Sequence, residues 1–218
     1  MLHKRLTLFA GHYGSGKTNI AVNYALFLAR EGKKVCIADL DIVNPYFRTA
    51  DSKAVLEKAG IDLISPQYAN TNVDLPALPA ESYRLVQDRE SYGIMDIGGD
   101  DRGAYALGRF VPAIKEENNY RLVFVFNGFR PLTRTAEDAL EIMREIEAAC
   151  GLQFTCIVNN SNLGAETTAE DFKSSMDEAE KLSAISGLPL WLNTAEKGIA
   201  GEIPEPKMPL ELQEKYFT

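Results

Sequence analysis

Residues 11–18 read Gly11-His12-Tyr13-Gly14-Ser15-Gly16-Lys17-Thr18 and match the pattern G-x-x-x-x-G-K-[ST] in full. Glycines in this pattern let several backbone N–H groups converge on phosphate oxygens, while the lysine reaches the terminal phosphates and the hydroxyl binds Mg²⁺. The stretch predicts a phosphate-binding loop, against the alternative of a glycine-rich turn with a chance lysine. We assign nucleotide binding to all eight residues and to Asn19, with Lys17 also catalytic and Thr18 also a metal ligand.

The segments on either side of this loop have the periodicities of a strand and a helix. Residues 6–10 (LTLFA) form a short apolar run that is typical of a buried strand. After the loop, Ile20, Tyr24 and Leu28 recur at helical spacing. Gly32 is placed to end that helix. The phosphates would therefore lie at a helix N-terminus, where unpaired N–H donors and a partial positive charge favour anions.

Composition limits the classes of protein to which the chain can belong. Its 218 residues are 45% apolar, so we expect residues 1–218 to form a single nucleotide-binding domain of the α/β class. The net charge of −8 includes no basic block. Binding to nucleic acid or to anionic lipid then lacks its electrostatic source, so we expect no nucleic-acid partner and no membrane partner.

Cysteine usage and the chain's beginning indicate a cellular compartment. Cys36, Cys150 and Cys156 show no C-x-x-C spacing, which predicts core packing rather than a disulfide or a metal cluster. The amino terminus runs directly into the first strand, leaving no room for a signal peptide. No apolar stretch approaches the roughly 18 residues of a membrane span. We therefore expect a cytoplasmic protein.

Strand and helix patterns alternate along the chain. Further strands are predicted at 34–39, 92–96, 121–127, 155–159 and 189–193, with a weaker candidate at 61–64. Apolar helical faces at 139–150 and 172–182 end near Gly151 and Gly187. This alternation predicts a mostly parallel twisted sheet with helices on both faces, in which ligands bind at the carboxyl ends of strands. The proline-rich segment 65–81 reads as a long loop over that edge.

Acidic residues follow two of these strands. Asp39 and Asp41 emerge at the end of the second strand, and Asp96 ends the strand at 92–96. Mg²⁺ is usually held by one or two carboxylates together with phosphate oxygens, and a further acid could position an attacking water. The alternatives are aspartates that form a turn before Pro45 and a flexible turn at 98–99.

With these residues the chain resembles the group of P-loop ATPases that contains MinD, ParA and the nitrogenase iron protein, with their relatives CobQ and CobB. The ordered motifs run from about residue 6 to residue 162. By this resemblance the fold is a three-layer P-loop sandwich, Asp41 positions the attacking water, and Asp39 lies on the magnesium side. Asp96 becomes the Walker B acid, and the run DIGGD at 96–100 resembles the D-x-x-G-D switch, which places Asp100 among the catalytic residues.

Three departures from the group bear on mechanism. The second loop position, usually a lysine that reaches a partner's nucleotide, is His12, which is partly charged near its reference pKa of about 6.5. Arg48 and Arg102 are alternative cations, or solvated surface arginines. The iron protein's cluster cysteines are missing, so no iron-sulfur cluster is expected. The short segment 206–218, with two glutamates and two lysines, is also unlike a basic membrane-targeting helix.

The stretch Asn159-Asn160-Ser161-Asn162, at the end of a predicted strand, indicates which nucleotide base the site would bind. Nickel-chaperone GTPases related to UreG and HypB share the loop spelling but place N-K-x-D here, and an amide at Asn162 cannot replace the aspartate's charge-assisted acceptor pair. ATP is therefore favoured over GTP. Asn159 matches the asparagine that contacts the base in the ATPase group, or else caps the strand.

These observations predict a Mg²⁺-dependent ATP-binding protein and slow ATPase. Nucleotide would close 39–48 and 96–103 around the γ-phosphate, and the closed form would pair with itself or with another protein. One alternative is an ATP-dependent, carboxylate-activating biosynthetic enzyme like dethiobiotin or cobyrinate-diamide synthetase. A second is a guanine-nucleotide metal chaperone of the UreG and HypB type.

Overall fold

A computed structural model describes residues 3–41, 49–65, 80–99 and 101–212. Within these residues eight strands form one sheet in the order β3-β2-β4-β1-β5-β6-β7-β8, and every neighbouring pair is parallel. The strands are β1 (Leu6–Ala10), β2 (Val35–Leu40), β3 (Asp62–Ile64), β4 (Tyr92–Ile97), β5 (Tyr120–Phe126), β6 (Cys156–Asn159), β7 (Leu190–Glu196) and β8 (Lys207–Leu210). The predicted parallel sheet is confirmed.

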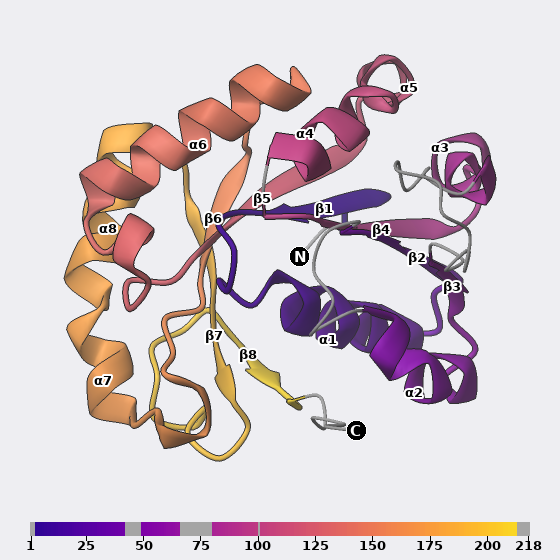
Figure 1. The fold of residues 1–218 in the computed structure, drawn as a ribbon. Helices are drawn as coiled ribbons and strands as arrows, with labels where there is room; N and C mark the ends of the chain where they lie inside the picture. The colour runs from indigo at the N-terminus through magenta and orange to yellow at the C-terminus, as the bar shows by residue number, and fades with distance from the viewer. Residues whose placement is uncertain (1–2, 42–48, 66–79, 100, 213–218) are drawn as a thin grey trace, which may run out of the picture.

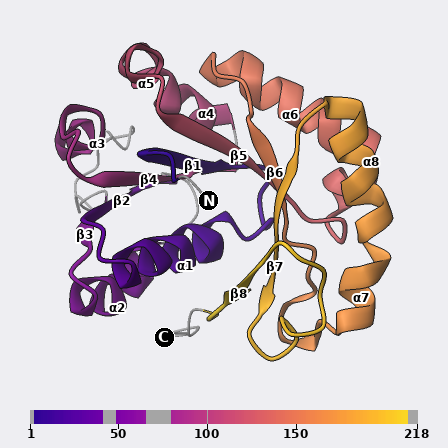
Figure 2. The same cartoon turned by 180° about the vertical axis from the view of Figure 1, so that it is seen from behind.

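Helices cover both faces of this sheet (Figure 1). The α-helices are α1 (Lys17–Arg30), α2 (Lys53–Lys58), α3 (Arg84–Gln87), α4 (Asp101–Gly108), α5 (Val111–Glu117), α6 (Ala136–Cys150), α7 (Ala169–Ser174) and α8 (Met176–Ser186). Helices α1 and α2 lie on one face, and α4, α5, α6 and α8 lie on the other, as the reverse view in Figure 2 also shows. The three-layer α/β sandwich is therefore confirmed.

Side chains of β1 alternate between two apolar cores. Leu6 and Leu8 pack in the core shared with α4, α5 and α6, whereas Phe9 packs with Ile20 and Tyr24 of α1. Because both faces are covered, every residue of β1 is buried. Such a strand reads as a continuous apolar run rather than an alternating one, which is why residues 6–10 could be recognised.

Two helices end at the glycines that the sequence predicted. Gly151 and Gly187 adopt left-handed conformations, with φ of 75° and 73°, directly after α6 and α8. The apolar face at 172–182 is divided between α7 and α8, which meet at Ser175. The short helices α2, α3, α4 and α5 and the strand β8 were not predicted from the sequence. Prolines directly before β8, at 206, and within it, at 209, argued against a strand there, although β8 is an edge strand, a position where proline is tolerated.

All three cysteines are buried free thiols, in agreement with the core packing that their positions predicted. Burial raises the pKa of Cys36 and of Cys156 to about 11. Among the described helices, none combines the length and the apolar character needed to cross a membrane. The loop predicted at 65–81 lies largely outside the described residues, and its last two residues begin a short 3₁₀ helix (Ala80–Tyr83).

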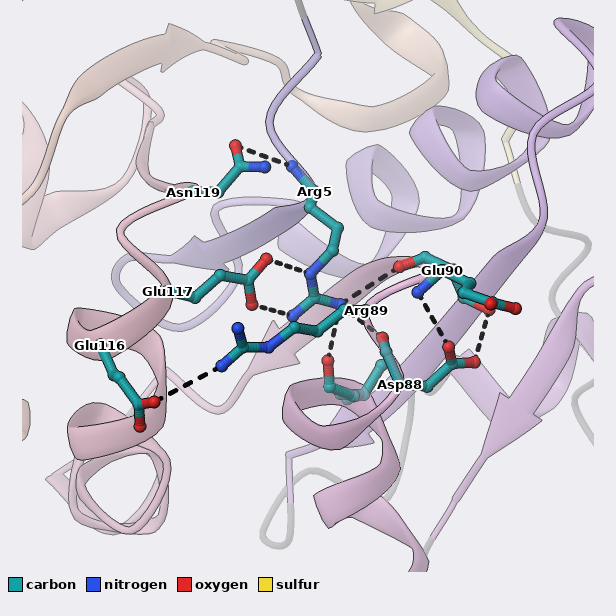
Figure 3. A network of polar contacts seen from close by, with 9 residues as sticks. Arg5, Asp88, Arg89, Glu90, Glu116, Glu117 and Asn119 are labelled. Atoms are coloured by element: carbon teal, nitrogen blue, oxygen red, sulfur yellow. Dashed lines mark hydrogen bonds and ion pairs between the residues drawn. The ribbon is translucent and has the colours of Figure 1, made fainter.

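A buried arginine holds together the amino-terminal edge of the sheet (Figure 3). The guanidinium group of Arg5 forms a two-pronged ion pair with the carboxylate of Glu117 at the end of α5. Its Nη1 atom donates to the backbone carbonyls of Leu85 and Asp88, each at 2.9 Å, and of Ser91 at 3.2 Å. One side chain thereby ties β1, α3, β4 and α5 together.

Candidate nucleotide site

The phosphate-binding loop lies between β1 and α1, at the carboxyl edge of the sheet. Gly16 is the residue before α1 and has φ of 90°, in the left-handed region that favours glycine. A Cβ atom at this position would lie 2.2 Å from Asn160 Nδ2. The loop can therefore reach the helix N-terminus along this path only with glycine at residue 16.

Lys17 is the first residue of α1 and is only 5% exposed. Its Nζ atom donates to the backbone carbonyl of His12, 3.2 Å away, so the ammonium group folds back over the loop. The N–H groups of the first helical turn lack intrahelical acceptors and carry partial positive charge. Lysine and helix end together form a site for an anion.

Two side chains from distant loops hold carbonyl groups of the phosphate loop. Arg130 Nε, which follows β5, donates to the carbonyl of Gly14 at 2.8 Å. Asn160 Nδ2, which follows β6, donates to the carbonyl of Ser15 at 2.7 Å, and its Oδ1 accepts from Thr194 Oγ1 at 2.9 Å. These bonds fix the orientation of two loop peptides. The sequence analysis missed both roles, although Asn160 follows a predicted strand directly.

The acidic residues predicted for the metal side come together next to the loop. Asp39 and Asp96 are paired across the β2–β4 register, and each is 1% exposed. Asp41 is 5% exposed, and its backbone N–H donates to Asp39 Oδ1 at 3.0 Å. The strand ends therefore bring three carboxyl groups to the same edge, as the sequence predicted.

Asp96 is incompletely satisfied inside the protein. Its Oδ2 accepts a hydrogen bond from Thr49 Oγ1 at 2.9 Å, whereas Oδ1 has no hydrogen-bond partner among the described residues. Burial raises the pKa of Asp96 to about 6, opposed by its hydrogen bond with Thr18 and by the charge of Lys17. Thr49 is fully buried at the start of a 3₁₀ helix (Thr49–Ser52) and was not singled out from the sequence.

A family model decides what kind of domain carries this site. The model of the CobQ/CobB/MinD/ParA nucleotide-binding domain matches residues 6–171. The chain belongs to this family. No curated protein matches it at the level of sequence. The motifs that suggested the CobQ/CobB/MinD/ParA group, from the phosphate loop to the strand ending at Asn159, all lie inside the matched range.

Solved structures share the fold of this CobQ/CobB/MinD/ParA domain. Cell division protein FtsY from Thermotoga maritima has a TM-score of 0.60 at 19% identity, covering 88% of this chain and 62% of that one. The 54 kDa signal recognition particle protein from Aeropyrum pernix, in complex with GDP, has a TM-score of 0.55 at 19% identity, covering 85% and 40%. Chloroplast FtsY from Physcomitrella patens scores 0.59 at 16% identity, covering 88% and 59%. The chain thus spans less than two thirds of each, and the likeness shows a P-loop NTPase fold.

The donor set of this family member fits Mg²⁺. Among the described residues no group of three or more His, Cys, Asp or Glu side chains could hold a metal ion by themselves. Mg²⁺ needs no such group, because it keeps several waters and takes one or two carboxylates plus phosphate oxygens. The buried carboxylate of Asp96 lies beside Thr18, and its Oδ1, which has no hydrogen-bond partner in the described part of the chain, is suited to accept from a metal-bound water.

Position 12, where the MinD-like pattern carries lysine, is half-buried in this domain. Burial lowers the pKa of His12, and the nearby charge of Lys17 lowers it further. The imidazole is therefore neutral at pH 7 in the ligand-free protein. Arg48 and Asp100 lie outside the described residues, as does the side chain of Arg102.

Gly99 marks a close approach between the segment after β4 and the phosphate loop. A Cβ atom at this position would lie 2.7 Å from the backbone nitrogen of Tyr13 and 2.9 Å from Lys17 Nζ. Such crowding is incompatible with a side chain, so glycine is needed here for packing. Gly99 therefore lies against the phosphate loop and Lys17, the groups expected to bind terminal phosphates.

Asn159, the residue predicted to contact the base, is fully buried. Its Oδ1 accepts from the Ser161 backbone at 3.1 Å and from the Ser161 hydroxyl at 2.7 Å, and its Nδ2 donates to Ser175 Oγ at 3.3 Å. These bonds shape the loop that follows β6, and the base contact stays a prediction. Asn162 Oδ1 accepts from the Gly164 N–H at 3.1 Å. Asn19 lies in the first turn of α1, beside Thr18.

Proposed function

We propose that the chain is a Mg²⁺-dependent ATP-binding switch that hydrolyses ATP slowly and associates with a second copy in its ATP state. The observation that carries the proposal is the meeting of Lys17 and Thr18 with the buried carboxylate of Asp96, whose Oδ1 has no hydrogen-bond partner among the described residues. A buried acceptor of this kind is costly unless a ligand completes it. We further propose that residues 1–218 act as one nucleotide-binding domain in the cytoplasm.

The described residues divide the work of hydrolysis between them. Lys17 would exchange the His12 carbonyl for oxygens of the terminal phosphates, and the N–H groups of the loop and first helical turn would hold the remaining phosphate oxygens. Thr18, Asp39 and Asp96 would hold Mg²⁺, which neutralises charge on the phosphates when bound. Asp41 would orient a water for in-line attack on the γ-phosphorus, releasing ADP and inorganic phosphate.

The loops beside the phosphate site favour adenine. Neither 127–135 nor 159–165 contains an aspartate or a glutamate. Recognition of guanine by its N1–H and N2–H donors needs a strong acceptor pair, which these stretches lack. The bound GDP in the Aeropyrum pernix structure belongs to that protein, which shares only the fold with this chain.

Exposed apolar side chains lie on four segments that follow β1, β4, β5 and β6. Tyr13 in the phosphate loop is 53% exposed, and Tyr105 in α4 is 66% exposed. Leu132 and Leu163, in the loops after β5 and β6, are 55% and 51% exposed. Exposed apolar groups of this size are common at interaction sites. Their positions after β1, β4, β5 and β6 support association through the edge that binds nucleotide.

The proposal is tested by comparing the protein's mass in solution with Mg²⁺-ADP and with a non-hydrolysable Mg²⁺-ATP analogue. We expect a monomer in ADP and a dimer with the analogue, measured by size exclusion with light scattering. An unchanged mass would refute the switch and favour a carboxylate-activating enzyme, whose ATP turnover would require an acceptor substrate. Tighter binding of GTP than of ATP in calorimetry would refute the base assignment.

Asp41→Asn tests the hydrolytic part of the proposal separately. The variant should bind ATP within about twofold of wild type and lower the turnover rate at least tenfold, since an amide orients the attacking water poorly. Asp177→Asn, an exposed position in α8, is the matched control and should leave both quantities unchanged. Wild-type turnover by Asp41→Asn would remove Asp41 from this role.

A further inference from the structure

Arg130 lies beside the phosphate loop, but the proposed phosphate and metal contacts do not use its charged group. It follows β5, and its side chain lies along Gly14: a Cβ atom built on Gly14 would be 3.4 Å from Arg130 Nε and 3.7 Å from Cζ. Nε is used by the Gly14 carbonyl. The two terminal nitrogens, Nη1 and Nη2, make no hydrogen bond with any residue that the structure describes. Half the guanidinium group is thus anchored and half is available.

The backbone that carries Arg130 is held in place. The carbonyl of Asn127 accepts from the Arg130 N–H at 3.1 Å and from the Thr133 hydroxyl at 2.7 Å. Asn127 Oδ1 also accepts from the Phe129 N–H at 3.0 Å. Ser161, from the loop after β6, accepts from the Gly128 N–H at 2.9 Å. The guanidinium group is therefore presented from a rigid turn, which lowers the entropic cost of using it to bind a ligand.

The sheet order decides which part of a nucleotide would meet this group. The metal-side residues Asp39 and Asp96 lie at the carboxyl ends of β2 and β4, on one side of β1. Arg130 and Asn160 follow β5 and β6, on the other side. If the terminal phosphates of a nucleotide lie near Lys17, Asp39 and Asp96, the rest of the ligand extends to the other side of β1. The nucleoside would then lie over the loops that follow β5 and β6.

We propose that Arg130 forms one wall of the nucleoside subsite and packs its guanidinium plane against the purine ring. The inference rests on the proposed nucleotide binding and adds a residue that selects for the base end of the ligand. Guanidinium groups stack well on aromatic faces because they are planar and weakly hydrated. The exposed Leu132 and Leu163 on the same two loops supply apolar surface for a base.

The test compares Mg²⁺-ATP with Mg²⁺-tripolyphosphate, which keeps the phosphates and lacks the nucleoside. In calorimetry Arg130→Ala loses the bond to the Gly14 carbonyl with either ligand, so the contrast between the two ligands is the readout. ATP binding should weaken about tenfold more than tripolyphosphate binding, the size of a cation–π contact. Arg130→Lys, which keeps the charge but not the plane, should lose most of the ATP affinity as well. Arg134→Ala, an exposed arginine in the same segment, is the matched control and should match wild type for both ligands.

Each contrary outcome has its own meaning. Equal losses for ATP and tripolyphosphate would overturn the inference and show that Arg130 acts on the phosphates or on the shape of the loop. Wild-type affinity in Arg130→Ala, or full rescue by Arg130→Lys, would also overturn it. A wild-type protein that binds tripolyphosphate but not ATP would refute the subsite, whereas one that binds neither ligand would refute the proposed function itself.

Discussion

Buried charged side chains lie beside both ends of β1, and the two ends differ in how fully the hydrogen bonds of those side chains are satisfied. At the amino end the guanidinium group of Arg5 is matched by Glu117 and by three backbone carbonyls. At the carboxyl end Lys17 Nζ donates to the His12 carbonyl, and Asp96 Oδ1 has no hydrogen-bond partner among the described residues. Strand β1 itself is apolar and buried between them.

The difference separates groups that hold the fold together from groups that await a ligand. A buried charge whose hydrogen bonds are all made stabilises the arrangement around it, and removing its partner is costly. A buried charge left partly unsatisfied lowers stability until a ligand binds. Mutations at the amino end should therefore lower stability and spare binding. Mutations at the carboxyl end should weaken binding without lowering the stability of the ligand-free protein.

Glu117→Ala should have the largest effect on stability, because it leaves the Arg5 guanidinium group buried without its counter-charge. We expect the free energy of unfolding to fall by about 3–5 kcal/mol in urea titrations. The adjacent Glu116→Ala is the control: Glu116 pairs with Arg89 at 3.6 Å on the surface, and its loss should cost about 0–1 kcal/mol. Equal losses in the two variants would contradict a structural role for the Arg5 network.

Lys17→Ala should affect binding without harming the fold. Loss of the ammonium group from the phosphate site should weaken Mg²⁺-ATP binding about 100- to 1000-fold, or roughly 3–4 kcal/mol, in calorimetry. Lys58→Ala, at an exposed position in α2, should bind ATP normally. Nucleotide affinity within tenfold of wild type would separate Lys17 from the phosphates.

Asp96→Asn should change how stability depends on pH. Folding raises the pKa of Asp96 to about 6 from 3.8, so between these values the folded protein holds a proton that the unfolded chain has released. Stability is therefore lost as pH rises through this window. The asparagine variant escapes the loss and should be more stable than ligand-free wild type above pH 6, by at most about 3 kcal/mol at about 1.4 kcal/mol per pKa unit.

Urea unfolding of both proteins between pH 4 and pH 7.5 measures this difference. It should shrink toward zero at the acid end, where both side chains are neutral. Addition of Mg²⁺-ATP should reverse the order of stability, because the wild-type carboxylate then has its ligand. A difference that does not vary with pH would show that Asp96 is not protonated in the folded protein at low pH.

Thr49→Val should have the smallest effect of the series. It removes the hydroxyl that orients Asp96 Oδ2 while keeping the shape of a buried side chain. We expect ATP binding to weaken about tenfold with Mg²⁺ present, in line with a hydrogen bond to a charged group, and not to change in EDTA. Thr49→Ser should restore most of the affinity. The same loss with and without Mg²⁺ would show that Thr49 supports the fold rather than the metal side.

Much of the fold could be predicted because the decisive patterns are local. The five residues of β1, the loop motif and the helical spacing of α1 follow one another in the chain. The glycines that end α6 and α8 likewise come directly after the helices that they end. Alternation of strands and helices then implied a parallel sheet. Short elements with weak periodicity, such as α4, α5 and the proline-containing β8, could not be recognised in this way.

For the candidate site, sequence by itself determined the phosphate loop and the acids at the carboxyl ends of β2 and β4, since each belongs to a continuous motif. Only the tertiary structure decided what surrounds them. Thr49 lies 47 residues from Asp96, Arg130 lies 116 residues from Gly14, and Asn160 lies 145 residues from Ser15. Arg5 and Glu117 are likewise 112 residues apart. A hydrogen bond depends on position in space, so contacts of such separation exist only once the parallel sheet has brought the strand ends together.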